Sequence, residues 1–370
     1  MDLTLTEEQE LIQATAREVL ESRYATAGAR AMEPDPAGYS AALWKEMVEL
    51  GWTGLALPES HGGLGAGFLE MCLVIEQTGH FQVPSPLLST VAGCGLPIAR
   101  YGTEEQRAEW LGAIARGRVM SPVPARWDRT DADVVAAESG AELALDGTAH
   151  LVPWAHAADD LLVVARLGDG LTALVVETAS PGVTVEPLEA IGTDRPCRVS
   201  FDGVRVAAGR ALPDGAAVDA AISAYGAAAT CAELVGAAQR VLDMTVEYAT
   251  QREQFGRPIG TFQAVQHHCA DMAMDVLTSR FIAYEAIWRL SAEPEVSMEV
   301  SMAVSMAKAW VSEAAERVCA RGHQVHGAIG FTREHDLHLY SRHAMAAALS
   351  FGDGDFHWER VAGHLDLPRS

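Results

Sequence analysis

The sequence predicts an α+β protein with several domains: helices at the N-terminus, a β-barrel or β-sandwich in the centre, and a four-helix bundle at the C-terminus. The chain has 370 residues, which is more than one hydrophobic core usually serves. Apolar residues recur at helical spacing in its first and last parts, whereas short β-branched runs fill the middle. We therefore expect three domains, at residues 1–117, 118–213 and 214–370.

The N-terminal domain is expected to be helical. Thr6 and Gln9 form a capping-box pattern in front of an apolar stripe, which predicts that the first helix begins here. Three glycines and a proline in residues 57–65 then interrupt the helical period. Further helices are expected at residues 41–50, 68–78 and 104–115.

The pattern changes near Met120, where segments become short, β-branched and separated by turn residues. Asp146-Gly147 and Asp202-Gly203 supply turn chemistry between them. Such regular spacing predicts a β domain rather than a long loop. The strands are expected at residues 134–137, 143–145, 161–165, 171–177, 183–187 and 198–206.

Helical periodicity returns in the C-terminal domain and persists over unusually long segments. The expected helices cover residues 219–250, 261–291 and 296–322, each longer than an average globular helix. Alanines crowd the first of them, including residues 227–229, which suits close helix packing. Long antiparallel helices of this kind predict a four-helix bundle.

The composition excludes several classes of function. A formal net charge of −23 argues against binding to nucleic acid or to anionic membranes, because both need clustered Lys and Arg. We find no signal peptide and no run of 18 apolar residues, so we expect a cytoplasmic protein. The six cysteines are scattered without a C-x-x-C pair, which predicts buried free thiols.

Two motifs in the C-terminal domain are the most informative in the chain. Residues 252–260 read Arg-Glu-Gln-Phe-Gly-Arg-Pro-Ile-Gly, and residues 324–331 read Gln-Val-His-Gly-Ala-Ile-Gly-Phe. Both resemble the flavin-contacting motifs of the acyl-CoA dehydrogenase family. The resemblance also covers residues 58–65 and 199–207, and the order of the three domains, so it spans essentially the whole chain.

The resemblance implies how the chain meets a flavin. In this family FAD lies in a groove of one subunit, and a neighbouring subunit covers its adenosine and diphosphate. A guanidinium such as Arg252 suits phosphate oxygens, and glycine at 327 lets main-chain amides approach the same group. The family usually has a second glycine where this chain has Ala328. The residues assigned to FAD by resemblance are Arg252, Phe255, Gln263, Gln324 and Gly327.

The position of the family's catalytic glutamate holds no acid in this chain. Dehydrogenation of a thioester needs a carboxylate that removes the α-proton. The usual Tyr-Glu-Gly-Thr position aligns with residues 350–353, where Phe351 replaces the glutamate. The family's alternative position, on the first bundle helix, aligns near Gly226. By resemblance, therefore, no residue is assigned as the catalytic base.

Three carboxylates remain as displaced candidates. Asp353 and Asp355 follow Phe351 closely, but a Gly-Asp-Gly-Asp segment is equally typical of a surface turn. Glu233 lies about two helical turns beyond Gly226, and we favour a packing role for it. Each of the three therefore has a structural interpretation beside the catalytic one.

The segments that hold the flavin ring in the family are altered as well. Residues 120–133 lack the family's Gly-Ser-Asp, and Leu151 replaces the tryptophan of its Trp-Ile-Thr segment. Pro153 replaces the Thr or Ser and removes an amide donor. Trp127 or Trp154 could stack on a flavin instead, although we favour the interpretation that they fill the vacated groove.

These departures favour a subunit that completes the FAD site of a partner. By resemblance to actinobacterial α2β2 members, the partner is a second, glutamate-bearing subunit that oxidises an acyl-CoA, such as a steroid side-chain thioester. Electron-transfer flavoprotein is the expected electron acceptor. This substrate class rests on family analogy alone.

Two alternatives stay open. One is a self-sufficient homo-oligomeric dehydrogenase whose base is Asp353 or Asp355. The other is a non-redox biosynthetic protein on the same fold. We expect no metal site, because the histidines at 326, 335, 338 and 343 follow helical spacing and lack nearby cysteines.

Overall fold

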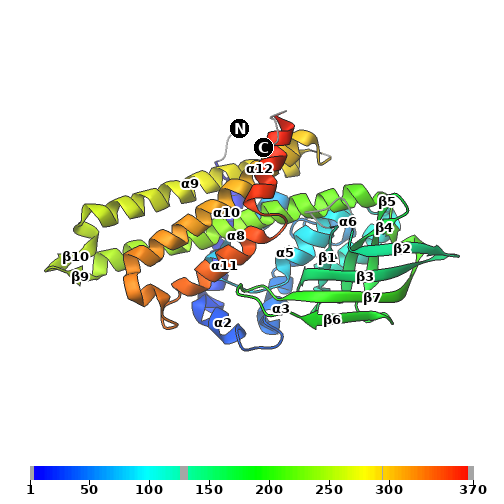
Figure 1. Cartoon of the computed structure of the whole chain (residues 1–370), viewed down its shortest axis with the longest axis horizontal. Coiled ribbons are helices and arrows are strands. Elements are labelled where there is room, and N and C mark those ends of the chain that lie inside the picture. Colours follow the sequence, from blue (N-terminus) through cyan, green and yellow to red (C-terminus); the bar gives the residue numbers. More distant parts are fainter. Residues whose placement is uncertain (1–3, 126–131, 294, 366–370) are drawn as a thin grey trace.

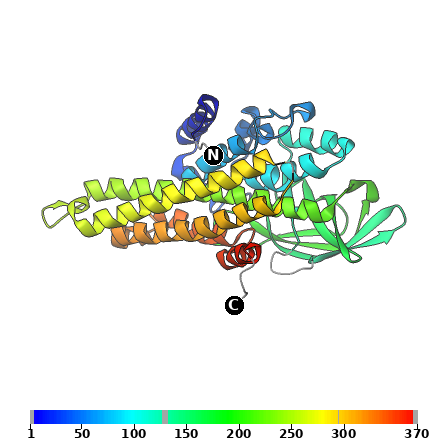
Figure 2. The ribbon, with the colours of Figure 1, turned by 90° about the horizontal axis from the view of Figure 1, so that it is seen from above.

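The protein is described by a computed structural model that covers residues 4–125, 132–293 and 295–365. N-terminal helices, a central mixed sheet and C-terminal helices follow one another along the chain (Figure 1). This confirms the predicted fold class. Seen from above, the N-terminal helices lie along one side of the long bundle helices, and the sheet lies at one end of the bundle (Figure 2).

The N-terminal region begins with the predicted capping box. Thr6 accepts a hydrogen bond from the backbone of Gln9, and the Gln9 side chain accepts one from the Thr6 backbone at 3.0 Å. A short π-helix at Val91–Gly95 is buried between α5 and α6. The helices are α1 (Glu7–Arg23), α2 (Ala25–Met32), α3 (Ala41–Glu49), α4 (Phe68–Phe81), α5 (Leu87–Thr90), α6 (Leu96–Tyr101) and α7 (Glu104–Ala115).

The central region forms one mixed sheet with the strand order β6-β7-β3-β2-β4-β5-β8, and β1 pairs in parallel with β4. Its long central strands β4 and β5 are almost wholly buried, whereas β3 and β7 alternate between buried and exposed residues. The strands are β1 (Met120–Val123), β2 (Val134–Ser139), β3 (Glu142–Pro153), β4 (Asp160–Leu167), β5 (Gly170–Glu177), β6 (Val183–Pro187), β7 (Pro196–Ala207) and β8 (Ala211–Leu212).

Long helices make up the C-terminal region. A small hairpin of β9 (Glu253–Gln254) and β10 (Arg257–Pro258) joins the first two at the far end of the bundle (Figure 1). Helix α8 begins four residues before the predicted start because the Asp214 side chain caps it through the backbone of Ala217. The helices are α8 (Gly215–Gln251), α9 (Gln263–Ala292), α10 (Met298–His326), α11 (Leu337–Leu349) and α12 (Gly354–His364).

Helix α8 is the core of the molecule. It crosses α4 so closely that a Cβ atom on Gly236 would lie 1.8 Å from the Glu76 carbonyl oxygen, which explains the small residues along it. It is the one described helix long and apolar enough to cross a membrane, and 83% of that apolar window is buried within the protein. The apolar character of this helix is therefore explained by its packing inside the protein.

Candidate functional site

The five residues assigned to FAD lie together at one end of the bundle. Arg252 ends α8 and Gln263 begins α9, while Gln324 and Gly327 lie at the end of α10 (Figure 1). The two helix ends are joined directly, because the Tyr248 ring stacks on the His326 ring at 4.6 Å. We call this end of the bundle, residues 252–263 with residues 324–331, the bundle tip.

The hairpin at the bundle tip presents an aromatic ring to the outside. Phe255 and Gly256 both have positive φ, 54° and 78°, as in a type I′ hairpin turn. This conformation is rare for a phenylalanine, and the ring is nevertheless 94% exposed. Phe262 supports the hairpin from below: its ring meets Phe255 edge-on, and the Arg257 guanidinium lies 4.3 Å from its centre.

The polar groups of the bundle tip are free for an external ligand. The Arg252 side chain is exposed and forms no ion pair with any residue that the structure describes. Gln263 and Gln324 are exposed too. Gly327 has a φ of 63°, and nothing lies within 4 Å of where its Cβ would be. An anion such as a diphosphate therefore meets a guanidinium, two amides and open backbone here.

The chain's own sheet lies far from its bundle tip. The first residue of α8, Gly215, packs against Leu171 and Thr172 on β5, whereas Arg252 follows the last residue of the same helix. With 37 residues, α8 separates the two ends by roughly 55 Å at 1.5 Å per residue. The bundle tip cannot reach a ligand held on the sheet of the same chain.

Phe351 and Gly226, the two positions that the resemblance aligns with the family's glutamate, contact each other in this structure. Phe351 follows α11, and its ring lies on the backbone of Gly226, about a third of the way along α8. A Cβ atom on Gly226 would lie 2.3 Å from the Phe351 Cε1 atom. One position therefore carries a ring and the other carries no side chain, and the ring uses the space that the glycine leaves.

The turn that carries Phe351 is held by a buried lysine. The Lys308 ammonium on α10 donates to the Ala348 carbonyl at 2.8 Å, to the Gly352 carbonyl at 3.1 Å and to the Ser312 hydroxyl at 3.0 Å. These three bonds use all three N–H donors of the side chain. Burial lowers the pKa of Lys308 to about 8.

A buried histidine on α12 holds the same turn from the other side. His357 Nε2 lies 3.1 Å from the Phe351 carbonyl oxygen, and Nδ1 lies 3.2 Å from the Ser305 hydroxyl. Burial and the nearby Lys308 charge lower the pKa of His357 to about 3. The ring is therefore neutral, and its Nε2–H donates to the Phe351 carbonyl.

Sequence reasoning missed both Lys308 and His357. A signal for the lysine was present, because the chain contains only two lysines, Lys45 and Lys308. The chain otherwise uses arginine, so a lysine among the apolar residues of α10 indicates a site that needs a compact cation with three donors.

The displaced acid candidates Asp353 and Asp355 lie at the start of α12. Asp353 caps α12, because its Oδ1 atom accepts from the Phe356 backbone at 2.9 Å, and Asp355 is exposed in the first turn of that helix. Both positions agree with the surface-turn interpretation of this segment.

Glu233 belongs to a separate buried cluster that joins the sheet to the bundle. Its carboxylate lies 3.3 Å from His343 Nε2 on α11, and His343 Nδ1 bonds the Thr193 hydroxyl at 2.8 Å. Burial alone would lower the pKa of His343, but Glu233 and Asp194 raise it to about 8. Burial raises the pKa of Asp194 to about 6, with Glu233 adding to the effect. This arrangement fits a packing role for Glu233.

Trp154, the described tryptophan that was considered as a stacking face, lies in the interior of the sheet region. Trp154 is 2% exposed, and its ring meets Tyr39 edge-on with centroids 5.9 Å apart. Leu151, where the family has a tryptophan, has a φ of 59° and is 70% exposed. Trp127 lies outside the described residues. Trp154 therefore fills the interior, as the packing interpretation predicted.

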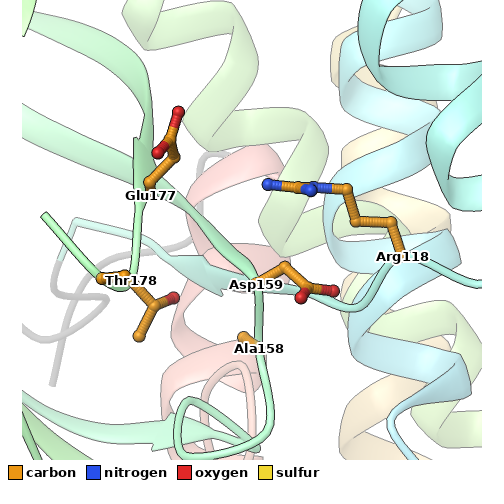
Figure 3. A pocket seen from close by; sticks show the side chains of 6 residues that line it. Arg118, Ala158, Asp159, Glu177 and Thr178 are labelled. Carbon is orange, nitrogen blue, oxygen red and sulfur yellow. The ribbon is translucent and has the colours of Figure 1, made fainter.

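Neither of two further cavities borders the bundle tip or Phe351. One, of about 380 Å³, lies at the sheet and is lined by Arg118, Asp159 and Glu177 (Figure 3). Arg118 is paired there with Asp160, and Asp159 accepts from the Val119 backbone at 2.9 Å. The other, of about 490 Å³, lies between α1, α4, α8 and α9.

No group of three or more His, Cys, Asp and Glu side chains that could hold a metal ion occurs within residues 4–125, 132–293 and 295–365. His326 instead bonds the Gly322 carbonyl at 2.9 Å. All six cysteines are free; five are buried, and Cys269 is partly exposed.

Two family models match the two helical regions of the chain. Residues 6–118 match the family described as acyl-CoA dehydrogenase, N-terminal domain, and residues 214–365 match acyl-CoA dehydrogenase, C-terminal domain. Acyl-CoA dehydrogenase FadE27 of Mycobacterium tuberculosis is 31% identical over 328 residues, which are 87% of each chain.

Two solved structures are similar over nearly all of both chains. A chain of the ChsE4-ChsE5 complex from Mycobacterium tuberculosis superposes with a TM-score of 0.92 at 29% identity and covers 100% of both chains. A chain of the Tcur3481-Tcur3483 steroid ACAD superposes with a TM-score of 0.90 at 30% identity, over 98% of this chain and 99% of that one.

Proposed function

The chain belongs to the acyl-CoA dehydrogenase family, and we propose that it acts there as a non-catalytic subunit that completes the FAD site of a partner. The partner carries the glutamate and binds most of the flavin, and it oxidises an acyl-CoA thioester between Cα and Cβ. This chain reaches across the interface with its bundle tip.

One observation carries the proposal: the exposed bundle tip lies at the opposite end of α8 from the chain's own sheet. Phe255 is 94% exposed in a left-handed conformation, which a soluble protein retains where a ligand or partner uses it. Because α8 spans roughly 55 Å, the group that the tip contacts belongs to another subunit.

The residues at the bundle tip fit the diphosphate half of FAD. Arg252 is exposed and unpaired among the described residues, so its guanidinium is free to bind phosphate oxygens. Gln324 and the backbone at Gly327 add donors beside it. When bound, FAD accepts the hydride that leaves the substrate; the chain's own contribution is to bind and orient the cofactor from outside.

The chain's own half-site fits the cofactor and substrate poorly. Pro153 has no amide hydrogen to donate, and Trp154 is buried against Tyr39. The position of the base is filled by the Phe351 ring on Gly226. The chain therefore holds no carboxylate where an α-proton would be removed.

The assembly we propose is an α2β2 heterotetramer with half the usual number of flavins. Two of the similar structures are named for a pair of proteins, ChsE4-ChsE5 and Tcur3481-Tcur3483, and the second is a steroid ACAD. By analogy, the partner's substrate is an acyl-CoA with a bulky group such as a steroid side chain. Electron-transfer flavoprotein receives the electrons, and the assembly is cytoplasmic.

The test is co-expression with a glutamate-bearing family member encoded beside this chain, followed by mass determination and flavin absorbance. We expect a yellow heterotetramer with two flavins per four chains, and a colourless chain when it is expressed alone. A lone chain that binds stoichiometric FAD and reduces it with an acyl-CoA would overturn the proposal.

The same preparation separates the two alternatives. A self-sufficient enzyme would lose turnover in Asp353→Asn or Asp355→Asn, although the capping bond of Asp353 and the exposure of Asp355 give neither acid a place at Gly226. A protein without flavin in any assembly would instead favour the non-redox biosynthetic alternative.

A further inference from the structure

We propose that the cavity between α1, α4, α8 and α9 is a binding site for a small organic acid that carries a hydroxyl or ammonium group beside its carboxylate. The cavity has a volume of about 490 Å³, within the range of small-molecule sites. It lies between the N-terminal helices and the bundle, away from Gly226 and from the bundle tip, so it is independent of the proposed flavin contact.

Buried polar residues on α4 form the floor of this cavity. Glu76, Gln77 and His80 are 3%, 5% and 5% exposed, although α4 is a core helix packed against α8. Polar side chains at such depth need bonding partners. Three of them beside one cavity indicate a prepared polar site rather than a packing defect.

Some polar side chains of this floor already have hydrogen-bond partners, which hold them in place. The Glu76 carboxylate accepts from the Tyr284 hydroxyl at 2.6 Å and from Arg280 at 3.2 Å. Arg280 also donates to the Gln239 side chain at 3.2 Å. Glu76 thereby neutralises Arg280, and neither charge is left for a ligand.

Arg17 is the cation that remains. It extends from α1 into the cavity wall and its Nη2 atom lies 3.2 Å from His80 Nε2. Burial, with Arg17, Arg240 and Arg280 nearby, lowers the pKa of His80 to about 3, so the ring is neutral and accepts from Arg17. Within the described chain Arg17 forms no ion pair, and a carboxylate from a ligand would supply one.

Two residues that line the cavity, Gln77 and Asp243, carry acceptor atoms without enough donors. The Gln77 Oε1 atom is buried and has no hydrogen-bond partner among the described residues. Asp243 lines the cavity too and accepts from Gln239 through Oδ1 at 2.8 Å, which leaves its second oxygen for another donor. A hydroxyl or ammonium group next to the ligand's carboxylate would satisfy both acceptors.

Two apolar residues, Leu5 and Phe281, complete the wall beside the polar Gln13, and Phe281 is 48% exposed. An acid with a short branched hydrocarbon body would cover these side chains while its polar end occupies the floor.

The test uses three probes with one carbon skeleton: leucine, 2-hydroxy-4-methylpentanoate and 4-methylpentanoate. Calorimetric titration of the full chain should give affinities for the first two about fivefold higher than for the third, because only they offer a donor to Gln77. Arg17→Gln should weaken all three about tenfold, whereas Arg23→Gln, on the same helix but paired with Glu46, should not.

The Gln77→Leu variant provides the sharpest control. It removes the unpaired acceptor, so the three probes should bind with more nearly equal affinities. The ratio of affinities between probes is not changed by a general loss of stability, because such a loss affects all three alike. No millimolar binding of any probe, or binding that Arg17→Gln leaves unchanged, would overturn the proposal. Binding that vanishes when the chain joins its partner would overturn it too, since a partner side chain would then occupy the cavity.

Discussion

Phe255 and Phe351 share a left-handed backbone conformation, with φ of 54° and 57°, yet one ring points out of the molecule and the other points in. Phe255 is 94% exposed on a two-residue turn. Phe351 packs onto Gly226, and Lys308 and His357 bind the carbonyls of its turn. A non-glycine residue in this conformation costs on the order of 1 kcal/mol, so each site retains the strain for its own reason.

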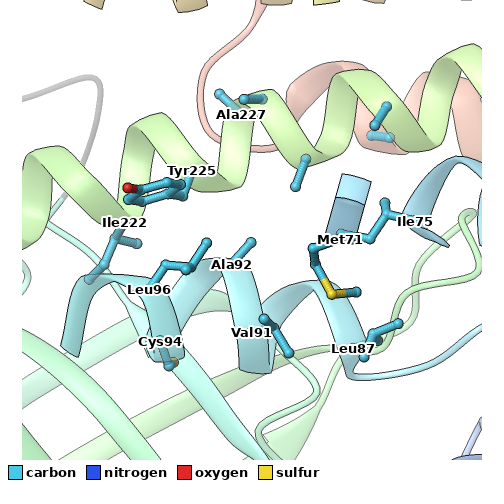
Figure 4. Close-up of a cluster of buried hydrophobic side chains, with 14 of the residues drawn as sticks. Met71, Ile75, Leu87, Val91, Ala92, Cys94, Leu96, Ile222, Tyr225 and Ala227 are labelled. Atoms are coloured by element: carbon cyan, nitrogen blue, oxygen red, sulfur yellow. The ribbon is translucent and has the colours of Figure 1, made fainter. Parts of the chain in front are cut away.

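The difference teaches how two regions of the bundle, the bundle tip and the Phe351 turn, divide their roles. At the bundle tip, groups are free and strain presents a ring to a neighbour. At the Phe351 turn, the carbonyls of Ala348, Phe351 and Gly352 are bonded internally. Helix α8 packs there on α4, the π-helix and α6 through Met71, Val91, Leu96 and Ile222 (Figure 4). We propose that the first region serves binding, whereas the second closes the fold.

The largest effect should come from the Phe351 turn through Lys308→Met. The change leaves the Ala348 and Gly352 carbonyls buried without their donor, and each such orphan costs about 1–3 kcal/mol. We expect the free energy of unfolding in urea to fall by about 3–4 kcal/mol. Lys45→Met is the matched control, because Lys45 is the only other lysine and lies exposed beside Glu49. Equal stability of the two variants would show that the hydrogen bonds of Lys308 do not stabilise the Phe351 turn.

The comparison of the two rings is tested by replacing each with glycine. Phe351→Gly relieves the backbone but removes a packed ring, and we expect a net loss of about 2–3 kcal/mol in the free energy of unfolding. Phe255→Gly relieves the same backbone and loses only an exposed edge contact with Phe262, so stability should rise by about 0.5 kcal/mol. Changes of the same sign in both variants would contradict the assignment of opposite roles.

Arg252→Ala tests the binding role of the bundle tip. Loss of a guanidinium–phosphate contact should weaken FAD binding by the assembled complex about 30-fold, equivalent to about 2 kcal/mol. Flavin fluorescence during titration measures this directly. Arg23→Ala, which removes an exposed arginine elsewhere, should leave the affinity unchanged, and unfolding of the chain should be insensitive to both changes.

The smallest effect is a pH dependence of the free energy of unfolding, and we expect it to come from the buried His343. Glu233 and Asp194 raise the pKa of His343 from 6.5 to about 8, so the folded state holds its proton more tightly than the unfolded state. The resulting stabilisation is fully present below pH 6.5 and is lost as the pH rises through about 8, by about 1–2 kcal/mol. The measurement is the difference in urea unfolding between the unaltered chain and His343→Gln at pH 6 and pH 9, because Lys308, whose pKa burial lowers to about 8, titrates in the same range with the opposite sign.

His343→Gln should remove this part of the pH dependence, while His150→Gln, at an exposed position, should keep it. Flavin binding at the tip should not follow the same titration, because it depends on a guanidinium, a group that is not deprotonated in proteins. A His343→Gln chain with the original slope would show that another group is responsible.

Much of the architecture could be read from local sequence. The capping box of Thr6 and Gln9 is present as predicted, and the long helices and most strands lie where periodicity placed them. The short elements escaped prediction, including β1, α2 and α12. In these segments tertiary packing outweighs a weak local pattern.

For the candidate site, too, local sequence predicted some features and tertiary packing decided others. By itself the sequence determined the family, and it predicted the residues of the bundle tip and the replacement of an acid at residues 226 and 351, because motifs and helix periods are local properties of the chain. Only the tertiary structure decided that Phe351 lies on Gly226, that Lys308 holds its turn, and that the tip and the sheet point to opposite ends. Those facts depend on how distant helices cross, and crossing geometry is set by packing between segments that no local pattern records.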